Sequence, residues 1–158
     1  MGSEMCIRDR LIELATSRGL SFGQGVFETI LVQNNNLILE RQHFARIAKG
    51  ARNIGVEFDQ DLALKVVLNF LHARQETSGI LKIILMAAPQ RQGAPRGYGQ
   101  CETASGVLIL LYSSCPSVLQ PGQIQSVVRI PEPLYPAPSA LVGLKMIAAP
   151  QYLSLIHI

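Results

Sequence analysis

The chain of 158 residues is long enough for one domain with a sizeable core, and its 48% hydrophobic and 16% charged residues exclude a disordered chain. The net charge of +3 is mild and the 14 Lys and Arg residues are scattered, which excludes a typical nucleic-acid-binding pattern. No apolar run is long enough for a membrane span, and the N-terminus lacks the apolar core of a signal peptide. The three cysteines form no disulfide or metal-binding pattern, so we expect a reducing, intracellular compartment.

The two ends of the chain can be encoded by one inverted DNA sequence. Met-Cys-Ile-Arg-Asp-Arg at 5–10 fits GATGTGTATAAGAGACAG, and Leu-Ser-Leu-Ile-His-Ile at 153–158 fits its reverse complement. This DNA resembles a transposon-end sequencing adapter that has been translated in frame. We therefore expect 1–10 and 153–158 to be adapter-derived and exclude them from the fold. The natural segment, from about Leu11 to Tyr152, is then expected to be a fragment that lacks its C-terminal part.

A glycine-rich stretch from Arg18 to Ile30 leads into the first predicted strand. Gly23 and Gly25 bracket Gln24, which predicts a tight loop, and the β-branched and aromatic residues of 26–32 predict a strand. Three asparagines at 34–36 predict a turn, because asparagine tolerates left-handed backbone conformations. The segment 37–39 is expected to return as a second strand, so that the pair forms a hairpin.

Two amphipathic helices are predicted next. The first covers about 41–54, with Gly55 as its terminator. Its apolar residues follow helical spacing: Phe44, Ile47, Ala48, Ala51 and Ile54. The second covers about 60–76, with Asp59 as its N-cap. Its buried side is expected to hold Leu64, Val67, Leu68 and Leu71.

The rest of the chain alternates strands with long connections. An apolar run at 80–86 predicts a central strand, and 107–112 predicts another buried strand. The loop at 87–103 is long enough to be functional. A further strand at 123–130 is expected to leave the first domain through the proline-rich connector 131–138, and a new element, expected to be a helix, begins at 141–146.

This order of elements predicts an α+β fold in which helices cover one face of a mostly antiparallel sheet. We expect a small two-layer domain over 11–122. The segment 123–152 is then a linker and the start of a larger domain.

Three sites carry residues with useful chemistry. Lys145 lies in an apolar run, where it either extends to solvent or acts as a shielded, reactive amine. Arg46 either lies on a solvated helix face or binds a phosphate through two hydrogen bonds. Arg96 and Tyr98, in a glycine-bordered loop, are either exposed loop residues or clamp a carboxylate.

Four stretches resemble the class IV aminotransferases, a family of pyridoxal-phosphate enzymes, and they occur in the family's order. They are the stretch 18–30, His43-Phe44-Ala45-Arg46-Ile47, Pro95-Arg96-Gly97-Tyr98 and Gly143-Leu144-Lys145. The resemblance covers about Ser17 to Tyr152. It implies the small N-terminal domain of that family's fold, followed by the beginning of its large domain.

The resemblance also implies roles for individual residues. Lys145 would be the lysine that holds pyridoxal 5'-phosphate covalently and carries protons, and Arg46 would hold the cofactor phosphate. Arg96 and Tyr98 would bind the substrate carboxylate, and Phe27 would form core or pocket wall beside the substrate. His43 would orient Arg46 or cap its helix.

Among family members, the chain resembles the aminodeoxychorismate lyases most. These carry the Arg-Gly-Tyr string, whereas D-amino-acid aminotransferases have tyrosine at the position of Phe27 and branched-chain enzymes have it at that of Pro150. The implied reaction converts 4-amino-4-deoxychorismate to 4-aminobenzoate and pyruvate, a step towards folate. The alternatives are a branched-chain or D-amino-acid aminotransferase, and a non-catalytic binding or oligomerisation domain. The family implies a homodimer, the cysteine pattern leads us to expect a cytoplasmic protein, and we expect the 158 residues alone to have little activity.

Overall fold

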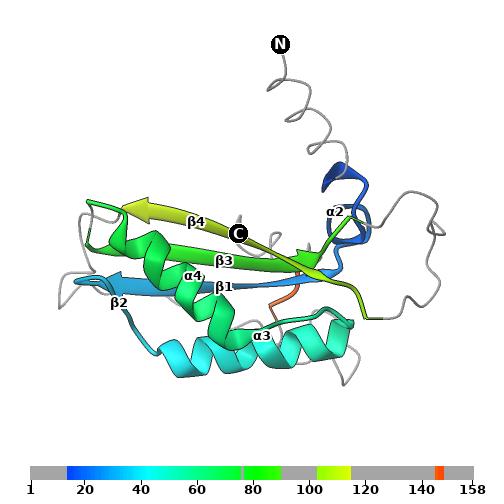
Figure 1. The fold of residues 1–158 in the computed structure, drawn as a ribbon, viewed down its shortest axis with the longest axis horizontal. Coiled ribbons are helices and arrows are strands. Elements are labelled where there is room, and N and C mark those ends of the chain that lie inside the picture. Colours follow the sequence, from blue (N-terminus) through cyan, green and yellow to red (C-terminus); the bar gives the residue numbers. More distant parts are fainter. Residues whose placement is uncertain (1–13, 76, 90–102, 115–144, 148–158) are drawn as a thin grey trace, which may run out of the picture.

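The computed structural model describes residues 14–75, 77–89, 103–114 and 145–147. Its four strands form one antiparallel sheet in the order β2-β1-β3-β4, and two longer helices cover one face of it (Figure 1). The elements in chain order are α2 (Arg18–Phe22), β1 (Gly25–Gln33), β2 (Asn36–Leu37), α3 (Glu40–Ile54), α4 (Gln60–His72), β3 (Gly79–Ala87) and β4 (Gly106–Ser114). The predicted two-layer α+β fold is confirmed.

The core lies between the two central strands and the helix layer. Side chains alternate between the two faces of a strand, and the buried positions of β1 and β3 point to the same layer. From the helices, Phe44, Ile47, Ala51, Ala63, Val67 and Leu71 complete this core, and from the sheet Val26, Ile30, Val32, Leu81, Ile83 and Leu85 do so. The opposite face carries Phe27, Thr29 and Lys82 at the intervening positions.

The turn after β1 has the predicted asparagine chemistry, but the second strand is shorter than predicted. Asn34 and Asn35 have positive φ angles of 50° and 62°, which asparagine tolerates well. β2 ends at Leu37, because Leu39 also has a positive φ, of 55°, and turns the chain into α3. The predicted hairpin is thus present, but its second strand covers Asn36–Leu37 and is followed by a turn instead of continuing to 39.

The helix ends largely follow the sequence signals. Gly55 closes α3 with a left-handed φ of 67°, and the Asp59 carboxylate accepts a hydrogen bond from the Leu62 N–H at 2.9 Å, as an N-cap does. α4 ends at His72, before the predicted end at 76. On its buried side it places Ala63 with Val67 and Leu71, while Leu64 packs against the core from a half-buried position.

Two further predictions need correction. The glycine-rich stretch is not a loop alone, since Ser17 caps the short helix α2 and Gly23 ends it with a φ of 64°. The strand predicted over 107–112 exists as β4, but it is not a buried strand: none of its residues is fully buried, because it has a single described neighbour in the sheet, β3. The predicted strand at 123–130 and the connector at 131–138 lie outside the described residues.

The segment 145–147 adds an edge to the sheet beside the first residues of β1. The Phe27 N–H donates to the Lys145 carbonyl at 2.8 Å, and the Ile147 N–H donates to the Gly25 carbonyl at 3.1 Å. Val26 and Met146 form the antiparallel bridge between these bonds. Met146 therefore lies in a β-bridge and not in the expected helix, and this bridge brings Lys145 to β1.

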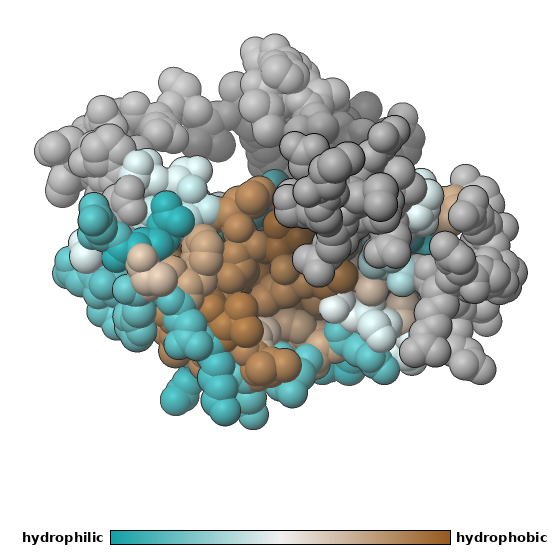
Figure 2. All heavy atoms as spheres, turned by 45° about the horizontal axis from the view of Figure 1, so that its top comes forward, coloured by the Kyte–Doolittle hydropathy of each residue, from teal (hydrophilic) through white to brown (hydrophobic). Residues whose placement is uncertain are grey.

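An apolar groove of about 170 Å³ lies between α4 and β4. Figure 2 shows an apolar area on this side of the molecule with hydrophilic residues along its border. The groove is lined mainly by Phe58, Leu62, Ala63, Val66, Leu85 and Leu108. Among the described helices, none combines the length and apolar character needed to cross a bilayer.

Candidate functional site

A buried carboxylate, Glu28, lies at the centre of the candidate site. Glu28 shares the inward face of β1 with Val26 and Ile30, and its side chain is only 1% exposed. A charge in such a position is costly unless cations and hydrogen-bond donors compensate it. Two of its partners, His43 and Arg46, are three residues apart on α3 and therefore lie on the same side of that helix.

Arg46 binds Glu28 through two parallel hydrogen bonds. The Arg46 Nε donates to Glu28 Oε1, and the Arg46 Nη2 donates to Glu28 Oε2 at 2.6 Å. The His43 Nδ1 lies 2.8 Å from Oε2. Because a carboxylate can only accept hydrogen bonds, Nδ1 carries the proton of this bond. Such a bidentate, charge-assisted pair fixes the plane of the guanidinium.

Lys145 reaches the same carboxylate from the segment 145–147, which pairs with the first residues of β1. Its Nζ lies 3.7 Å from Glu28 Oε2. The side chains of Lys145 and Arg46 are 40% and 38% exposed, whereas Glu28 is buried. One buried carboxylate thus contacts both cations, and the side chains of both cations remain partly accessible to solvent.

The charges around Glu28 keep it ionised. Burial raises the pKa of the Glu28 carboxyl, but the hydrogen bonds from Arg46 and His43, together with the charges of Arg46 and Lys145, lower that pKa more, so the net shift is downward. The hydrogen bonds to Glu28 raise the pKa of Arg46 further above its usual value. Glu28 is therefore an anion, and Arg46 a cation, at neutral pH.

Phe27 lies on the other face of β1 and is contacted by two ammonium groups. The Lys82 Nζ lies 4.7 Å from the centre of the Phe27 ring, and the Lys145 Nζ lies 5.9 Å from it. The Nζ atoms of Lys82 and Lys145 are therefore no farther apart than 4.7 Å plus 5.9 Å. Lys82 pairs with Thr29 in the register of β1 and β3, which places it diagonally opposite Phe27. Within the described part of the chain, Lys82 makes no ion pair.

The donor groups of this site fit a ligand that carries both a phosphate and an aldehyde. Glu28 occupies Nε and Nη2 of Arg46, and Nη1 makes no hydrogen bond to any described residue. A guanidinium offers five donors in a planar fork, so Arg46 retains donors for an anion. An accessible amine, that of Lys145, lies 3.7 Å from Oε2, the carboxylate oxygen that Arg46 Nη2 also contacts. No group of three or more metal-ligating side chains occurs among the described residues.

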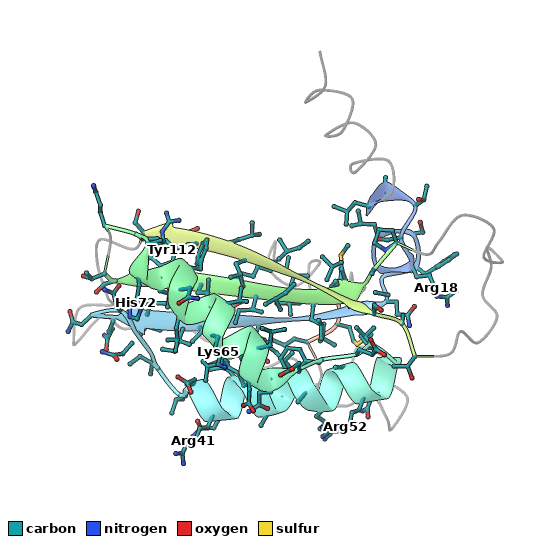
Figure 3. The ribbon with its side chains drawn as sticks, viewed as in Figure 1. Arg18, Arg41, Arg52, Lys65, His72 and Tyr112 are labelled. Carbon is teal, nitrogen blue, oxygen red and sulfur yellow. The ribbon has the colours of Figure 1, made fainter. Side chains whose placement is uncertain are left out.

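The other arginines of α3 take no part in this arrangement. Arg41 and Arg52 project from the helix away from the sheet (Figure 3). Their position distinguishes them from Arg46, which is drawn to the sheet by Glu28. The helix therefore has a solvated basic side and a site-forming side.

Of the residues suggested by the sequence, the structure brings three together. Arg46 and Lys145 both contact Glu28, and Lys145 also lies near the ring of Phe27, the residue before Glu28 in β1. Arg96 and Tyr98 lie outside the described residues. Sequence reasoning missed Glu28 and Lys82. A signal for Glu28 was present, since it is a charged residue at a position where the alternation of β1 requires an inward, apolar side chain.

A family model described as amino-transferase class IV matches residues 25–154. The chain belongs to the class IV aminotransferase family. Members of this family are pyridoxal-phosphate enzymes, either lyases or transaminases. Lys145, Arg46 and Phe27 all fall within the matched region of this class IV chain.

Solved structures support the class IV fold. The chain matches the 4-amino-4-deoxychorismate lyase of Pseudomonas aeruginosa with a TM-score of 0.67 and 23% identity, covering 90% of this chain and 51% of that one. A Legionella pneumophila protein, provisionally assigned as the same lyase, matches with a TM-score of 0.62 and 24% identity over 90% and 49%. The branched-chain amino acid aminotransferase of Escherichia coli matches with a TM-score of 0.57 and 15% identity over 89% and 47%.

These similarities concern the fold, because all three identities are low. The class IV chain spans about half the length of the solved structures that it matches. A comparison with curated proteins gave no match.

Proposed function

We propose that the complete protein is a pyridoxal-phosphate enzyme of the aminodeoxychorismate lyase type, in which Lys145 holds the cofactor and Arg46 binds its phosphate. The observation that carries this proposal is the buried Glu28, which gathers Arg46, His43 and Lys145 around one carboxylate. When bound, pyridoxal phosphate supplies an electron sink for breaking bonds beside an amine.

The residues of the chain have distinct tasks in this proposal. Arg46 uses the donors that Glu28 leaves free to hold the phosphate, while Glu28 and His43 orient the guanidinium. The Lys145 amine would hold the cofactor through its aldehyde, and its Nζ would accept and return a proton. Phe27 forms the wall beside it. Arg96 and Tyr98 are proposed for the substrate carboxylate on the strength of the family resemblance.

The position of Lys82 favours a substrate with two carboxylates. Besides Lys145, Lys82 also places an ammonium group near the Phe27 ring, and this group has no ion-pair partner among the described residues. A carboxylate bound there would be additional to one bound by Arg96 and Tyr98. 4-Amino-4-deoxychorismate carries two carboxylates, and its conversion to 4-aminobenzoate and pyruvate is the reaction that we propose.

The first experiment traps the cofactor on the complete protein. Pyridoxal phosphate is added, the mixture is reduced with borohydride, and the modified lysine is mapped by mass spectrometry. We expect the label on Lys145, its loss in Lys145→Ala, and normal labelling in Lys65→Ala, a matched control on the exposed side of α4. Absence of a label on Lys145 would instead favour a binding or oligomerisation domain on the same fold.

A second measurement separates the lyase from the transaminase. Pyruvate release from 4-amino-4-deoxychorismate is expected, and amino transfer to a branched-chain or other α-keto acid is not. Transfer without pyruvate release would favour a branched-chain or D-amino-acid aminotransferase. We also propose a homodimer from the family resemblance, a cytoplasmic location from the cysteine pattern, and a domain boundary near residue 122 from the order of the predicted elements.

A further inference from the structure

Gly25 has a backbone conformation that any residue type can adopt. It lies in β1, and it is not among the described glycines with positive φ. Glycine inside a strand weakens the strand and often marks a place where another part of the chain approaches closely. Gly25 is also buried. A glycine is therefore explained here by the lack of room for a side chain and not by the backbone conformation.

The space above Gly25 is filled by the segment that carries Lys145. A Cβ atom on Gly25 would overlap Ile147 Cδ1, and it would lie 2.9 Å from both Leu85 O and Met86 Cβ. Real Cβ atoms essentially never approach other heavy atoms this closely. The Ile147 side chain thus packs directly over the bare Cα of Gly25.

The same residues form the hydrogen bonds of the added edge. The Gly25 carbonyl accepts from the Ile147 N–H, and the Lys145 carbonyl accepts from the Phe27 N–H. A shift of one residue in such a pairing would turn every side chain of the edge to the other face. In the observed pairing Lys145 lies opposite Phe27 at the edge of β1, and from there its amine reaches both the Phe27 ring and Glu28 Oε2, 3.7 Å away. The pairing therefore sets the position of Lys145 along β1.

We propose that Gly25 is a positioning residue for Lys145: its missing side chain provides the seat for Ile147, and this seat fixes the register of the edge. Gly25 touches neither substrate nor cofactor in this role. The inference rests on the proposed function insofar as Lys145 is the reactive lysine. The pairing itself can be measured without any cofactor.

Two readouts on the complete protein test the inference. The first is hydrogen exchange of the Phe27 and Ile147 amides, and the second is the rate at which pyridoxal phosphate and borohydride label Lys145. For Gly25→Ala we expect at least tenfold faster exchange of both amides and at least tenfold slower labelling. The matched control is Gly79→Ala. Gly79 is also a crowded strand glycine, but its neighbours are Ser113 and Tyr112.

A second substitution separates positioning from general damage to the sheet. Ile147→Ala leaves Gly25 and its contacts with β3 intact but empties the seat, so the same two amides should again exchange faster. In the double variant Gly25→Ala/Ile147→Ala, the overlap with Ile147 Cδ1 is removed and only the close contacts with Leu85 O and Met86 Cβ remain, so exchange should be slower than in Gly25→Ala alone. Such non-additivity is expected only for residues in direct contact.

Wild-type exchange rates in both Gly25→Ala and Ile147→Ala would overturn the inference, as would purely additive effects in the double variant. Faster exchange in Gly79→Ala as well would also overturn it, because the effect would then not be specific to the seat. If the wild-type protein carries no label on Lys145, the proposed function fails, and hydrogen exchange alone decides the role of Gly25.

Discussion

Glu28 carries its charge at a position of β1 whose neighbours on the same face are aliphatic and buried. Its three cationic or donor partners come from α3 and from the edge at 145–147. The carboxylate therefore joins two parts of the chain that are distant in sequence. The period of the strand predicts that Glu28 points inward, but it does not predict which cations it meets. Arg46 and Lys145 were identifiable as candidates only through the family motifs, whereas the pairing register that brings them together is a tertiary property.

At the residue scale we predict that Glu28→Gln destabilises the protein at neutral pH and less so in acid. The pKa of Glu28 is lowered in the folded state, so its contribution to stability is present above its unfolded pKa, about 4.3, and is lost as the pH falls through the lower folded value. Because Arg46 is partly exposed, we expect a loss of about 1.5 kcal/mol at pH 7, the low end for a charged hydrogen bond. Urea unfolding at pH 7 and pH 3 measures it.

The exposed Glu57 provides the control for this experiment. Glu57→Gln should change the free energy of unfolding little at either pH. An equal loss for Glu28→Gln at both pH values would show that the charge of Glu28 is not what stabilises the fold.

At the element scale, helix and strand boundaries followed local chemistry where that chemistry is strong. Gly55 and Asp59 end and begin their helices as predicted, since a left-handed glycine and a side-chain cap are local devices. The end of β2 was not predictable, because Leu39 adopts a left-handed conformation that leucine disfavours. Likewise, the apolar run of β4 looks buried in sequence but lies beside a single described strand.

The conformation of Leu39 leads to a second prediction. Left-handed conformations cost a residue with a Cβ roughly 1–2 kcal/mol, and asparagine tolerates them better than leucine does. Leu39 is 61% exposed and contributes little burial. Leu39→Asn should therefore raise the free energy of unfolding by roughly 0.5–1 kcal/mol, measured by thermal or urea unfolding. The neighbouring Ile38→Asn, at a position without positive φ, should give no gain, and a gain there of similar size would contradict the explanation.

At the scale of the whole molecule, one core joins both central strands to both helices (Figure 1). The alternating strands and the helical spacing were enough to predict this two-layer arrangement. They were not enough to predict that 145–147 returns to β1, because a three-residue edge has no periodicity of its own. The chain also spans only about half the length of the solved structures that it matches.

The shared core predicts that a cavity in the sheet destabilises the helices as well. Ile30 is fully buried between the layers. Ile30→Ala should lower the free energy of unfolding by about 2–5 kcal/mol, and helix and sheet signals should be lost in one transition. Ile80→Ala, on the exposed face of β3, should cost much less. Separate transitions for helix and sheet signals would contradict a single core.

The added edge at 145–147 also sets an order of events during synthesis. Glu28 and Arg46 are only 18 residues apart and can pair as soon as α3 has formed on β1. Lys145 leaves the ribosome roughly a hundred residues later, a delay of about 5–20 s at typical translation rates. Once α3 packs on β1, Arg46 and His43 can compensate the charge of Glu28 before Lys145 is synthesised. The Lys145 amine is therefore the last member of the cluster around Glu28 to be synthesised.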